Sequence, residues 1–449
     1  MNILTLLQPI QNSVSKTTLR QMSRIILAMI AMTGRVTMLG LSRWAEKGGS
    51  YRTVQRFFYT IIPWGQVFWS FFRERLLDKQ DTYLLAGDEC VVTKAGDRTH
   101  GLDYFFSSLM QKAVPGLSFF TLALVSTKQR RSYPVKVEQM IRTEAEKAAS
   151  QAKKQAKKDK TDAPKMKRGR PKGSRNKDKT AVELNPELQH IQKMLQSFLS
   201  TIQGALHLTY LLLDGHFGNY PAFHMVRQCH LHLISKLRYD AALCFPYSGP
   251  SPKRGPRPRL GMKVDVRNIP ADYLKETKVG GGFETRTYQM QLLHEDFPDP
   301  LNVVILLRTN LTTNAWANVI LFSSDLELPY DKLVDYYSLR FQIEFNFRDA
   351  KQFWGLEDFM NVTQTAVTNA ASLALFMVDV SQMLMCEYRQ NDPDFSILDL
   401  KAYYRGYRYV TETIQMLPQK PDDNLVSQLF QKVAALGRIH PANQPVPSG

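Results

Sequence analysis

Two carboxylates stand out in this sequence because the segments around them predict burial. Asp88 lies within the apolar run YLLAGDECVV, and Asp214 ends the run TYLLLDG. An unpaired carboxylate in an apolar interior is costly, so each residue needs a positive charge, hydrogen bonds or a metal ion. A single Asp at the end of a strand is more often a turn former, so neither residue alone indicates a site.

Glu344 supplies a third carboxylate, on a later segment with the pattern of an amphipathic helix. Three carboxylates can hold two hard cations such as Mg²⁺, for which Mn²⁺ can substitute. Two metal ions about 3.5–4 Å apart activate a water or a 3′-hydroxyl and stabilise the leaving oxygen of an in-line phosphoryl displacement. Asp88, Asp214 and Glu344 therefore form a candidate metal site for phosphodiester chemistry.

The segment 333–354 is predicted to form one helix with two adjacent stripes of side chains. The first stripe recurs every three or four positions, as expected of a face packed on a core. Its members are Tyr336, Leu339, Ile343, Phe347, Ala350 and Trp354. The second stripe is rotated from the first by about one residue step, or ~100°. Its members are Tyr337, Arg340, Glu344, Arg348 and Lys351.

Two interpretations of the polar stripe stay open. In the simpler one, Glu344 forms ordinary ion pairs with Arg340 and Arg348 at helical i,i+4 spacing. In the other, Glu344 binds a metal ion at the edge of a cleft, and the neighbouring cations neutralise phosphates there. Tyr337 would then add a hydrogen bond or a stacking surface.

The composition describes a basic globular protein. The 449 residues include 58 Lys and Arg against 41 Asp and Glu, a net charge of +17, and 44% are hydrophobic. Such a chain can bury a large core in two or three domains, and its charge indicates a polyanionic partner such as nucleic acid. The four cysteines are far apart and form no CxxC pair, which fits a reducing cytoplasm and predicts no zinc ribbon.

Residues 1–78 are predicted to be helical, with a Gly-Gly break followed by Ser50 as a candidate helix cap. If this is a helix-turn-helix, Arg52, Gln55 and Arg56 lie on the exposed face of the second helix, where they read a DNA groove. Two packed helices joined by a tight turn are an equally good interpretation.

Lys and Arg dominate the segment 145–180, where aromatic residues nearly vanish, and this predicts a solvated insertion. Its centre, KRGRPKGSRNK around Arg170, resembles an AT-hook, which binds a narrow A·T-rich minor groove. A basic linker without base preference is the alternative. No segment predicts a membrane span, because the two apolar stretches contain Arg35 and Asp379.

The sequence resembles the DDE transposases of bacterial insertion sequences, in the subgroup with a Tyr-x2-Arg-x3-Glu-x6-Lys signature. That signature is matched position for position by Tyr337, Arg340, Glu344 and Lys351, and GDEC and LLLDGHFGN occur in the expected order. The resemblance implies an α/β fold with an RNase H-like core. It further implies a helical DNA-binding domain at 1–78, the first part of the core at 79–224 and a β-rich insertion at 225–325. The final part of the core would follow at 326–390, and a helical C-terminal region at 391–449.

The resemblance also implies roles for single residues. The catalytic metal ligands would be Asp88, Asp214 and Glu344, each needed to hold two Mg²⁺ ions. The contacts to phosphates near the cleaved end would be Tyr337, Arg340 and Lys351. Trp316, in the insertion, would stack on a base flipped out during hairpin formation; a place in the core is the alternative.

The implied function is cut-and-paste DNA transposition. The enzyme would cleave double-stranded DNA at the element ends through a hairpin and join the freed 3′-hydroxyl to target DNA. It would act as a homodimer in the cytoplasm, at the bacterial nucleoid. Two alternatives are a DNA-binding protein of the same fold without catalysis, and a nuclease that does not join strands.

Overall fold

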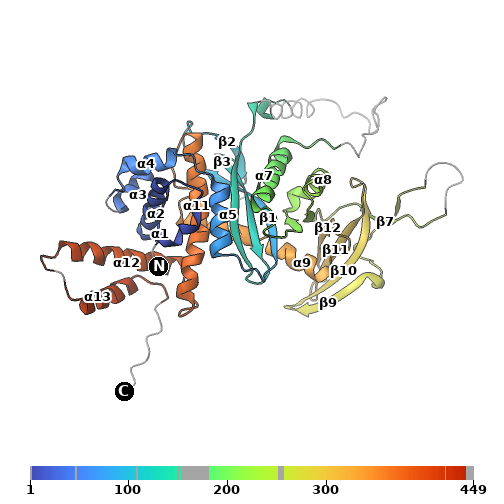
Figure 1. The fold of residues 1–449 in the computed structure, drawn as a ribbon. Helices are drawn as coiled ribbons and strands as arrows, with labels where there is room; N and C mark the ends of the chain where they lie inside the picture. The colour runs from blue at the N-terminus through green and yellow to red at the C-terminus, as the bar shows by residue number, and fades with distance from the viewer. Residues whose placement is uncertain are drawn as a thin grey trace, which may run out of the picture.

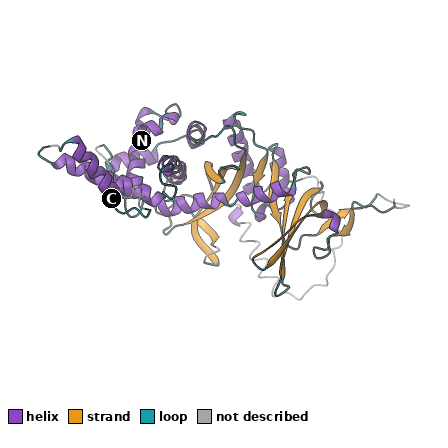
Figure 2. Ribbon diagram, turned by 90° about the horizontal axis from the view of Figure 1, so that it is seen from below, coloured by secondary structure: helices purple, strands orange, loops and turns teal. Residues whose placement is uncertain are grey.

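The computed structural model describes residues 3–440, except 46–47, 108–109, 145, 149–151, 153–181, 251–256 and 420. Arg170 and the AT-hook-like centre therefore lie outside the described residues. Helices gather toward one end of the molecule and most strands toward the other (Figures 1 and 2). The long helix α11 (Gln364–Arg389) runs through the helical end.

The described part of the N-terminal segment is helical, as predicted. Its elements are α1 (Ile3–Leu6), η1 (Gln8–Ile10), α2 (Lys16–Ala31), α3 (Met38–Trp44), α4 (Tyr51–Tyr59) and α5 (Trp64–Arg75). Ser50 occupies the N-cap position of α4, but its hydroxyl lies 3.1 Å from the hydroxyl of Thr53 and bonds no backbone N–H. Arg52 and Arg56 are exposed on α4.

A buried amide ties the N-terminal helices to α11. Asn369 accepts a hydrogen bond from Nε1 of Trp64 at 2.7 Å and donates to the carbonyls of Phe58 and Thr60 at 2.8 and 2.7 Å. The side chain thereby donates to carbonyls at the end of α4, which receive no hydrogen bond from an N–H group of that helix. The contact fixes the N-terminal helices on the same core that supports the sheet.

One twelve-stranded sheet joins the described strands. In spatial order ten of them run β2-β3-β1-β5-β6-β12-β11-β10-β7-β8, with β4 beside β3 and β9 beside β10. The bounds are β1 (Tyr83–Thr93), β2 (Asp103–Ser107), β3 (Lys112–Ser126), β4 (Arg131–Met140), β5 (Tyr210–Leu212), β6 (His232–Leu237), β7 (Leu243–Pro246), β8 (Leu260–Lys263), β9 (Leu274–Gly280), β10 (Phe283–His294), β11 (Leu301–Asn310) and β12 (Trp316–Ser323). Only β1, β5 and β6 pair in parallel.

The predicted strand-rich insertion is continuous with the core sheet. Strand β6 pairs in parallel with β5 and antiparallel with β12, so no break in hydrogen bonding separates β7–β12 from the first strands. The fold is therefore mixed α/β, with one large mixed sheet and helices at both ends of the chain.

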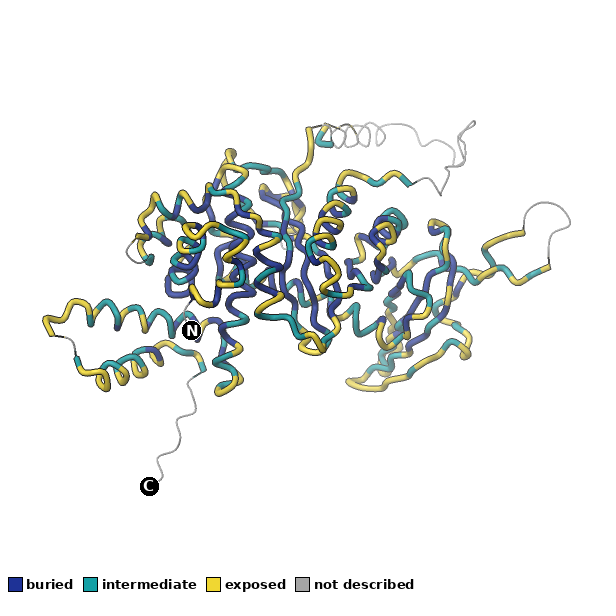
Figure 3. Tube along the Cα trace, viewed as in Figure 1, coloured by how far each residue is buried: buried dark blue, intermediate teal, exposed yellow. Residues whose placement is uncertain are grey.

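Alternate residues of the central strands face two different cores. Leu84 and Ala86 of β1 pack with α9, α10 and α11, whereas Leu85 packs with α7 and α8. These helices are α7 (Pro186–Ile202), α8 (Tyr220–Gln228), α9 (Tyr330–Leu339) and α10 (Gln342–Phe353). In Figure 3 the buried residues run through the central strands and α11. Asp88 and Asp214 continue the alternation of the first face.

The prediction of one helix over 333–354 is wrong, because the structure has two helices, α9 and α10. The N–H groups of Arg340, Phe341, Ile343 and Glu344 bond carbonyls three residues earlier, at 3.1–3.3 Å, so the junction is a tightened 3₁₀-like turn. Helix α9 packs on β6, β11 and β12, whereas α10 packs on β4 and α11, so the two helices contact different elements. The predicted apolar stripe is otherwise buried, with Tyr336 partly exposed.

Helix α11 is long and apolar enough to cross a membrane by length and composition. However, 83% of its most apolar window is buried inside the protein. This burial is the pattern of a core helix that is hydrophobic on all sides.

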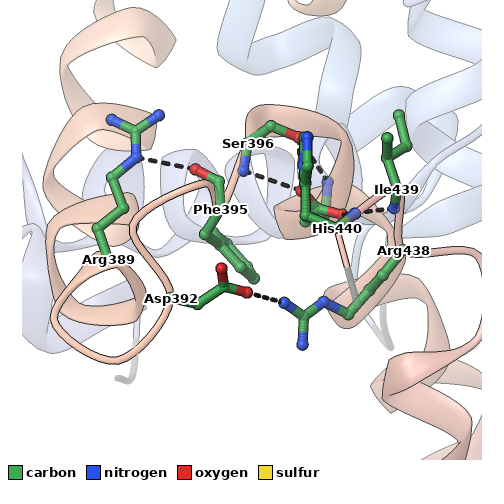
Figure 4. Close-up of polar contacts among 8 residues, drawn as sticks. Arg389, Asp392, Phe395, Ser396, Arg438, Ile439 and His440 are labelled. Carbon is green, nitrogen blue, oxygen red and sulfur yellow. Dashed lines mark hydrogen bonds and ion pairs between the residues drawn. The ribbon is translucent and has the colours of Figure 1, made fainter. Parts of the chain in front are cut away.

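The C-terminal helices α12 (Ile397–Met416) and α13 (Asp423–Ala435) form a hairpin. They approach closely at Gly406, where an added Cβ would lie 2.6 Å from the carbonyl of Val433. Residues 438–440, here called the C-terminal clasp, fold back onto the start of α12 (Figure 4).

A buried carboxylate holds the clasp in place. Asp399 is fully buried and accepts hydrogen bonds from the N–H and hydroxyl of Ser396, the N–H groups of Ile439 and His440, and Nδ1 of His440, at 2.6–3.1 Å. Burial raises the pKa of Asp399, but the hydrogen bonds from Ser396 and His440 outweigh it and leave the pKa well below its ordinary value. The clasp is therefore stabilised above the ordinary carboxyl pKa of about 3.9 and weakened as the pH falls below it.

Replacing Asp399 with Ala should lower the free energy of opening of α12 by about 2–4 kcal/mol, because several buried donors lose their acceptor. Hydrogen exchange of peptides from α12 measures this opening. Asp422→Ala is the matched control, since Asp422 caps α13 through one exposed bond to the N–H of Leu425 and should cost about 1 kcal/mol. Equal effects of the two variants would contradict the role given to the clasp.

Candidate active site

The parallel pairing of β1 with β5 brings the two strand carboxylates together. Ala86 is paired with Leu212, and Asp88 and Asp214 each follow two residues later. Asp214 keeps an extended backbone, with φ −71° and ψ 176°, so both side chains leave the same face of neighbouring strands. Gly87 precedes Asp88 on β1, and a Cβ added there would lie 2.8 Å from the ring of Phe120, so the packing of the two strands leaves no space for a side chain at this position.

Arg340 connects Asp88 with the helix carboxylate. Its Nη1 lies 2.9 Å from Oδ2 of Asp88, and its Nη2 lies 3.1 Å from Oε1 of Glu344. The Arg340 and Asp88 side chains are only 14% and 18% exposed, against 41% for Glu344, so the first pair is the more strongly shielded from water. The predicted pair of Glu344 with Arg348 does not form, because Arg348 bonds Asp349 instead.

The cluster carries excess negative charge despite Arg340. Burial raises the pKa of Asp88 to about 6, the nearby Asp214 and Glu344 add to the rise, and Arg340 opposes it. A hydrogen bond from the N–H of Glu89, at 2.8 Å, also favours the ionised form. Asp88 therefore needs more positive charge than the protein supplies.

Asp214 also has the turn-forming role that its position predicts. Its Oδ1 accepts a hydrogen bond from the N–H of His216 at 3.1 Å, and its carbonyl accepts one from the hydroxyl of Ser235 at 2.7 Å. These bonds begin the short helix η2 (Gly215–Phe217) and orient the carboxylate. The turn and a place in the site are thus compatible for this residue.

Tyr337 and Lys351, the remaining residues of the signature, flank the cluster. Burial raises the pKa of Tyr337, Arg340 opposes the rise, and the charges of Asp214 and Asp88 act on the same hydroxyl. The guanidinium of Arg340 lies 6.0 Å from the Tyr337 ring. Lys351 donates to the carbonyl of Val91 at 2.8 Å and pairs with Glu357 at 3.2 Å, so it bridges α10 to β1.

Lys236 is a residue near the site that the sequence did not single out. Leu212 pairs with Ile234, so Lys236 on β6 occupies the same row as Asp88 and Asp214. It pairs with Leu321, which packs on the same side of the sheet as Leu212 and Ile234. The register of the three parallel strands thus places a cation at the end of this row. In the sequence, only the alternation within HLISKL indicates which face of the strand Lys236 occupies.

Within the part of the chain that the structure describes, no three His, Cys, Asp or Glu side chains lie close enough to hold a metal ion as they stand. Arg340 lies between Asp88 and Glu344, which accounts for the spacing. The donors are nonetheless all carboxylate oxygens, the ligands that Mg²⁺ prefers. Asp88 and Asp214 occupy neighbouring positions of one row and Glu344 lies across Arg340 from Asp88, so this donor set fits a divalent cation.

The predicted contacts outside the cluster are exposed. Trp316, at the start of β12, is 41% exposed, which excludes the core alternative, and the guanidinium of Arg267 lies 4.5 Å from its ring. Arg52 and Arg56 lie on the surface of α4.

Comparison with protein families identifies the class of protein. The sequence model described as DDE superfamily endonuclease matches residues 9–292, well over half of the chain. The chain therefore belongs to this superfamily and is a DDE transposase-type protein, as the resemblance implied. The match includes Asp88 and Asp214 and ends before Glu344. A comparison with curated proteins gives no significant match.

Membership establishes the coarse activity. The superfamily comprises endonucleases and transposases that act on DNA and use divalent metal ions. The positive charge of the chain agrees with a DNA substrate.

Replacing Asp88 with Asn should stabilise the metal-free protein. The folded pKa of about 6 exceeds the ordinary value, so ionisation of Asp88 destabilises the folded state progressively as the pH rises from about 4 to 6 and fully above that. We expect a gain of about 1–3 kcal/mol in unfolding free energy at pH 8 and a smaller gain at pH 5.

Denaturant unfolding in the presence of EDTA measures this difference. Asp240→Asn is the control, because Asp240 forms an exposed pair with Arg238, which should contribute less than about 1 kcal/mol. A gain that is the same at both pH values would remove the unfavourable ionisation of Asp88 as its cause.

Proposed function

We propose that the protein is a DNA transposase that cleaves the ends of its own mobile element and joins the freed 3′-hydroxyl to target DNA. The observation that carries the proposal is that Asp88 and Asp214 lie in one row at the end of the parallel strands, while Arg340 joins Asp88 to Glu344. Three carboxylates on rigid elements are well suited to hold two divalent cations, which then carry out the phosphodiester chemistry.

In this proposal Asp88, Asp214 and Glu344 hold two Mg²⁺ ions, which when bound activate the attacking oxygen and neutralise charge on the phosphate. Arg340 releases its carboxylates and donates to a phosphate oxygen, for which its planar fork is well suited. Tyr337 lies beside Arg340 and orients the same phosphate. Lys236, at the end of the row, adds a further cation on the side of Asp214.

Finer features of the proposal rest on the four-residue signature. Tyr337, Arg340, Glu344 and Lys351 favour the subgroup that excises its element through a hairpin. In such an intermediate the exposed ring of Trp316 is available to stack on a flipped base, a contact worth about 1–3 kcal/mol.

The proposed organisation follows the predicted boundaries. Residues 1–78 form a DNA-binding domain in which Arg52 and Arg56 contact DNA, and 79–224 with 326–390 form an RNase H-like core. The strands within 225–325 form the insertion, and 391–449 the C-terminal region. Arg170 contacts A·T-rich DNA from the basic insertion. The active form is a homodimer that joins paired ends in the cytoplasm, at the nucleoid.

Asp88→Asn, Asp214→Asn and Glu344→Gln should each abolish cleavage while DNA binding persists, because a neutral amide does not replace a metal-binding carboxylate. The assay incubates purified protein with a DNA fragment that carries its own gene and flanks, with and without Mg²⁺, and maps breaks to the nucleotide. We expect Mg²⁺-dependent breaks at inverted flanking repeats and sealed ends on denaturing gels.

Asp335→Asn is the matched control, since Asp335 is an exposed carboxylate on α9 that pairs with Arg130; it should cleave as the wild type does. Cleavage by any of the three site variants would remove that residue from the site. Binding without breaks by folded wild type would favour the non-catalytic alternative, and breaks without joined products would favour the nuclease.

A further inference from the structure

A second basic site lies on the flank of α10 that faces away from the carboxylates. A cavity of about 300 Å³ opens between α10, α11 and the start of α12. Three arginines line it, Arg131 from β4, Arg348 from α10 and Arg389 from α11, and Asp349 is the only carboxylate among the described lining residues. The cavity therefore carries a net positive charge.

The position of this arginine cavity follows from the geometry of α10. At ~100° per residue, Asp349 lies about 140° around the helix from Glu344, and Arg348 lies between them. Arg348 bonds Asp349 at 3.0–3.1 Å and its guanidinium lies 4.7 Å from the exposed ring of Phe345. The carboxylate cluster and the cavity thus occupy opposite flanks of one helix.

Arg389 is held in place with most of its donors unused. Its Nε donates to the carbonyl of Phe395 at 2.8 Å (Figure 4). Its two terminal amino groups form no hydrogen bond or ion pair with a residue that the structure describes. Burial and the neighbouring charge of Arg131 lower the pKa of Arg389. The guanidinium of Arg131 forms no hydrogen bond or ion pair with any residue that the structure describes, although its backbone pairs with β3. Two guanidinium groups without an acidic hydrogen-bond partner, on neighbouring elements of one cavity, indicate a site for an anion.

The start of α12 closes one side of the cavity. Ser396, Ile397 and Leu398 line it, and they begin a helix of 20 residues. The carboxylate of Asp399 already balances the positive end of this helix, so the arginines supply the positive charge of the cavity. Arginines from three elements thus converge on one cavity, a combination suited to a phosphate.

We propose that the arginine cavity binds a backbone phosphate of DNA, on the strand opposite the one cleaved at Glu344. The inference rests on the proposed function for the placement of the cleaved strand. An α-helix with its side chains is about 10–12 Å wide, which matches the roughly 12 Å width of the DNA major groove. A duplex lying over α10 can therefore place one strand at the carboxylates and the other at Arg131 and Arg389.

The test measures DNA binding by the full-length chain in EDTA, so that cleavage does not contribute. Fluorescence anisotropy with a duplex from the element end gives the slope of log affinity against log salt concentration. Arg131→Gln should weaken binding about tenfold, while Arg389 still holds the phosphate and keeps most of the slope. Adding Arg389→Gln should lower the magnitude of the slope by about 0.9, the value for one phosphate contact, because both arginines hold one phosphate.

Arg73→Gln is the matched control, because Arg73 is an exposed arginine on α5 that pairs only with its neighbour Glu74. Phosphate ethylation interference then locates the contact. Wild type should be sensitive at one phosphate on the uncut strand, and the variant with both arginines replaced should lose that sensitivity. Thermal unfolding of each variant verifies the fold.

Three results would overturn the inference. They are a slope for the double variant equal to that of Arg73→Gln, a loss of about 1.8 in the double variant, which would mean two phosphates, and interference on the cleaved strand. A change in self-association without a change in slope would assign the cavity to an acidic protein surface instead. Because the slope is measured in EDTA, without cleavage, a failed cleavage assay bears on the proposed function and leaves this inference standing.

Discussion

The ion pairs of Arg340 with Asp88 and Glu344 are the interactions on which the candidate site depends. Each carboxylate belongs to a different element, one to the first strand of the sheet and the other to α10. The surrounding structure supplies the repulsion that makes Arg340 necessary, because the parallel register of β1 and β5 holds Asp214 beside Asp88. The sheet brings two carboxylates together, and Arg340 at the helix junction supplies the cation that pairs with one of them.

The junction between α9 and α10 determines where Arg340 lies. A straight helix over these residues would pack on one surface, whereas the tightened turn lets α9 cover the strands near β12 while α10 covers β4 and α11. Arg340 sits in that turn. Its position is thus set by two packing surfaces at once, which explains how a long, flexible side chain can be held at 2.9–3.1 Å from two acceptors.

Local patterns predicted the elements, and contacts between distant segments decided what they did not. The burial of Ile343 and Trp354 follows from helical periodicity, and the need of Asp88 for a partner follows from its apolar neighbours. The break at Arg340 has no Gly or Pro to mark it, because it results from the two packing surfaces. Lys236 and the arginine cavity escaped prediction because both depend on which strands and helices become neighbours.

The continuity of the sheet from β1 to β12 also fixes the distance between Trp316 and the strands that carry the carboxylates. Trp316 lies five residues before Leu321, the partner of Lys236, and at about 3.4 Å per residue this is ~17 Å along the strand. Hydrogen-bonded strands do not slide in small steps, since a shift of one residue turns every side chain to the opposite face. Because five is an odd number, the alternation of β12 places Trp316 on the face of the sheet opposite Lys236, and the paired strands fix the span between the two residues.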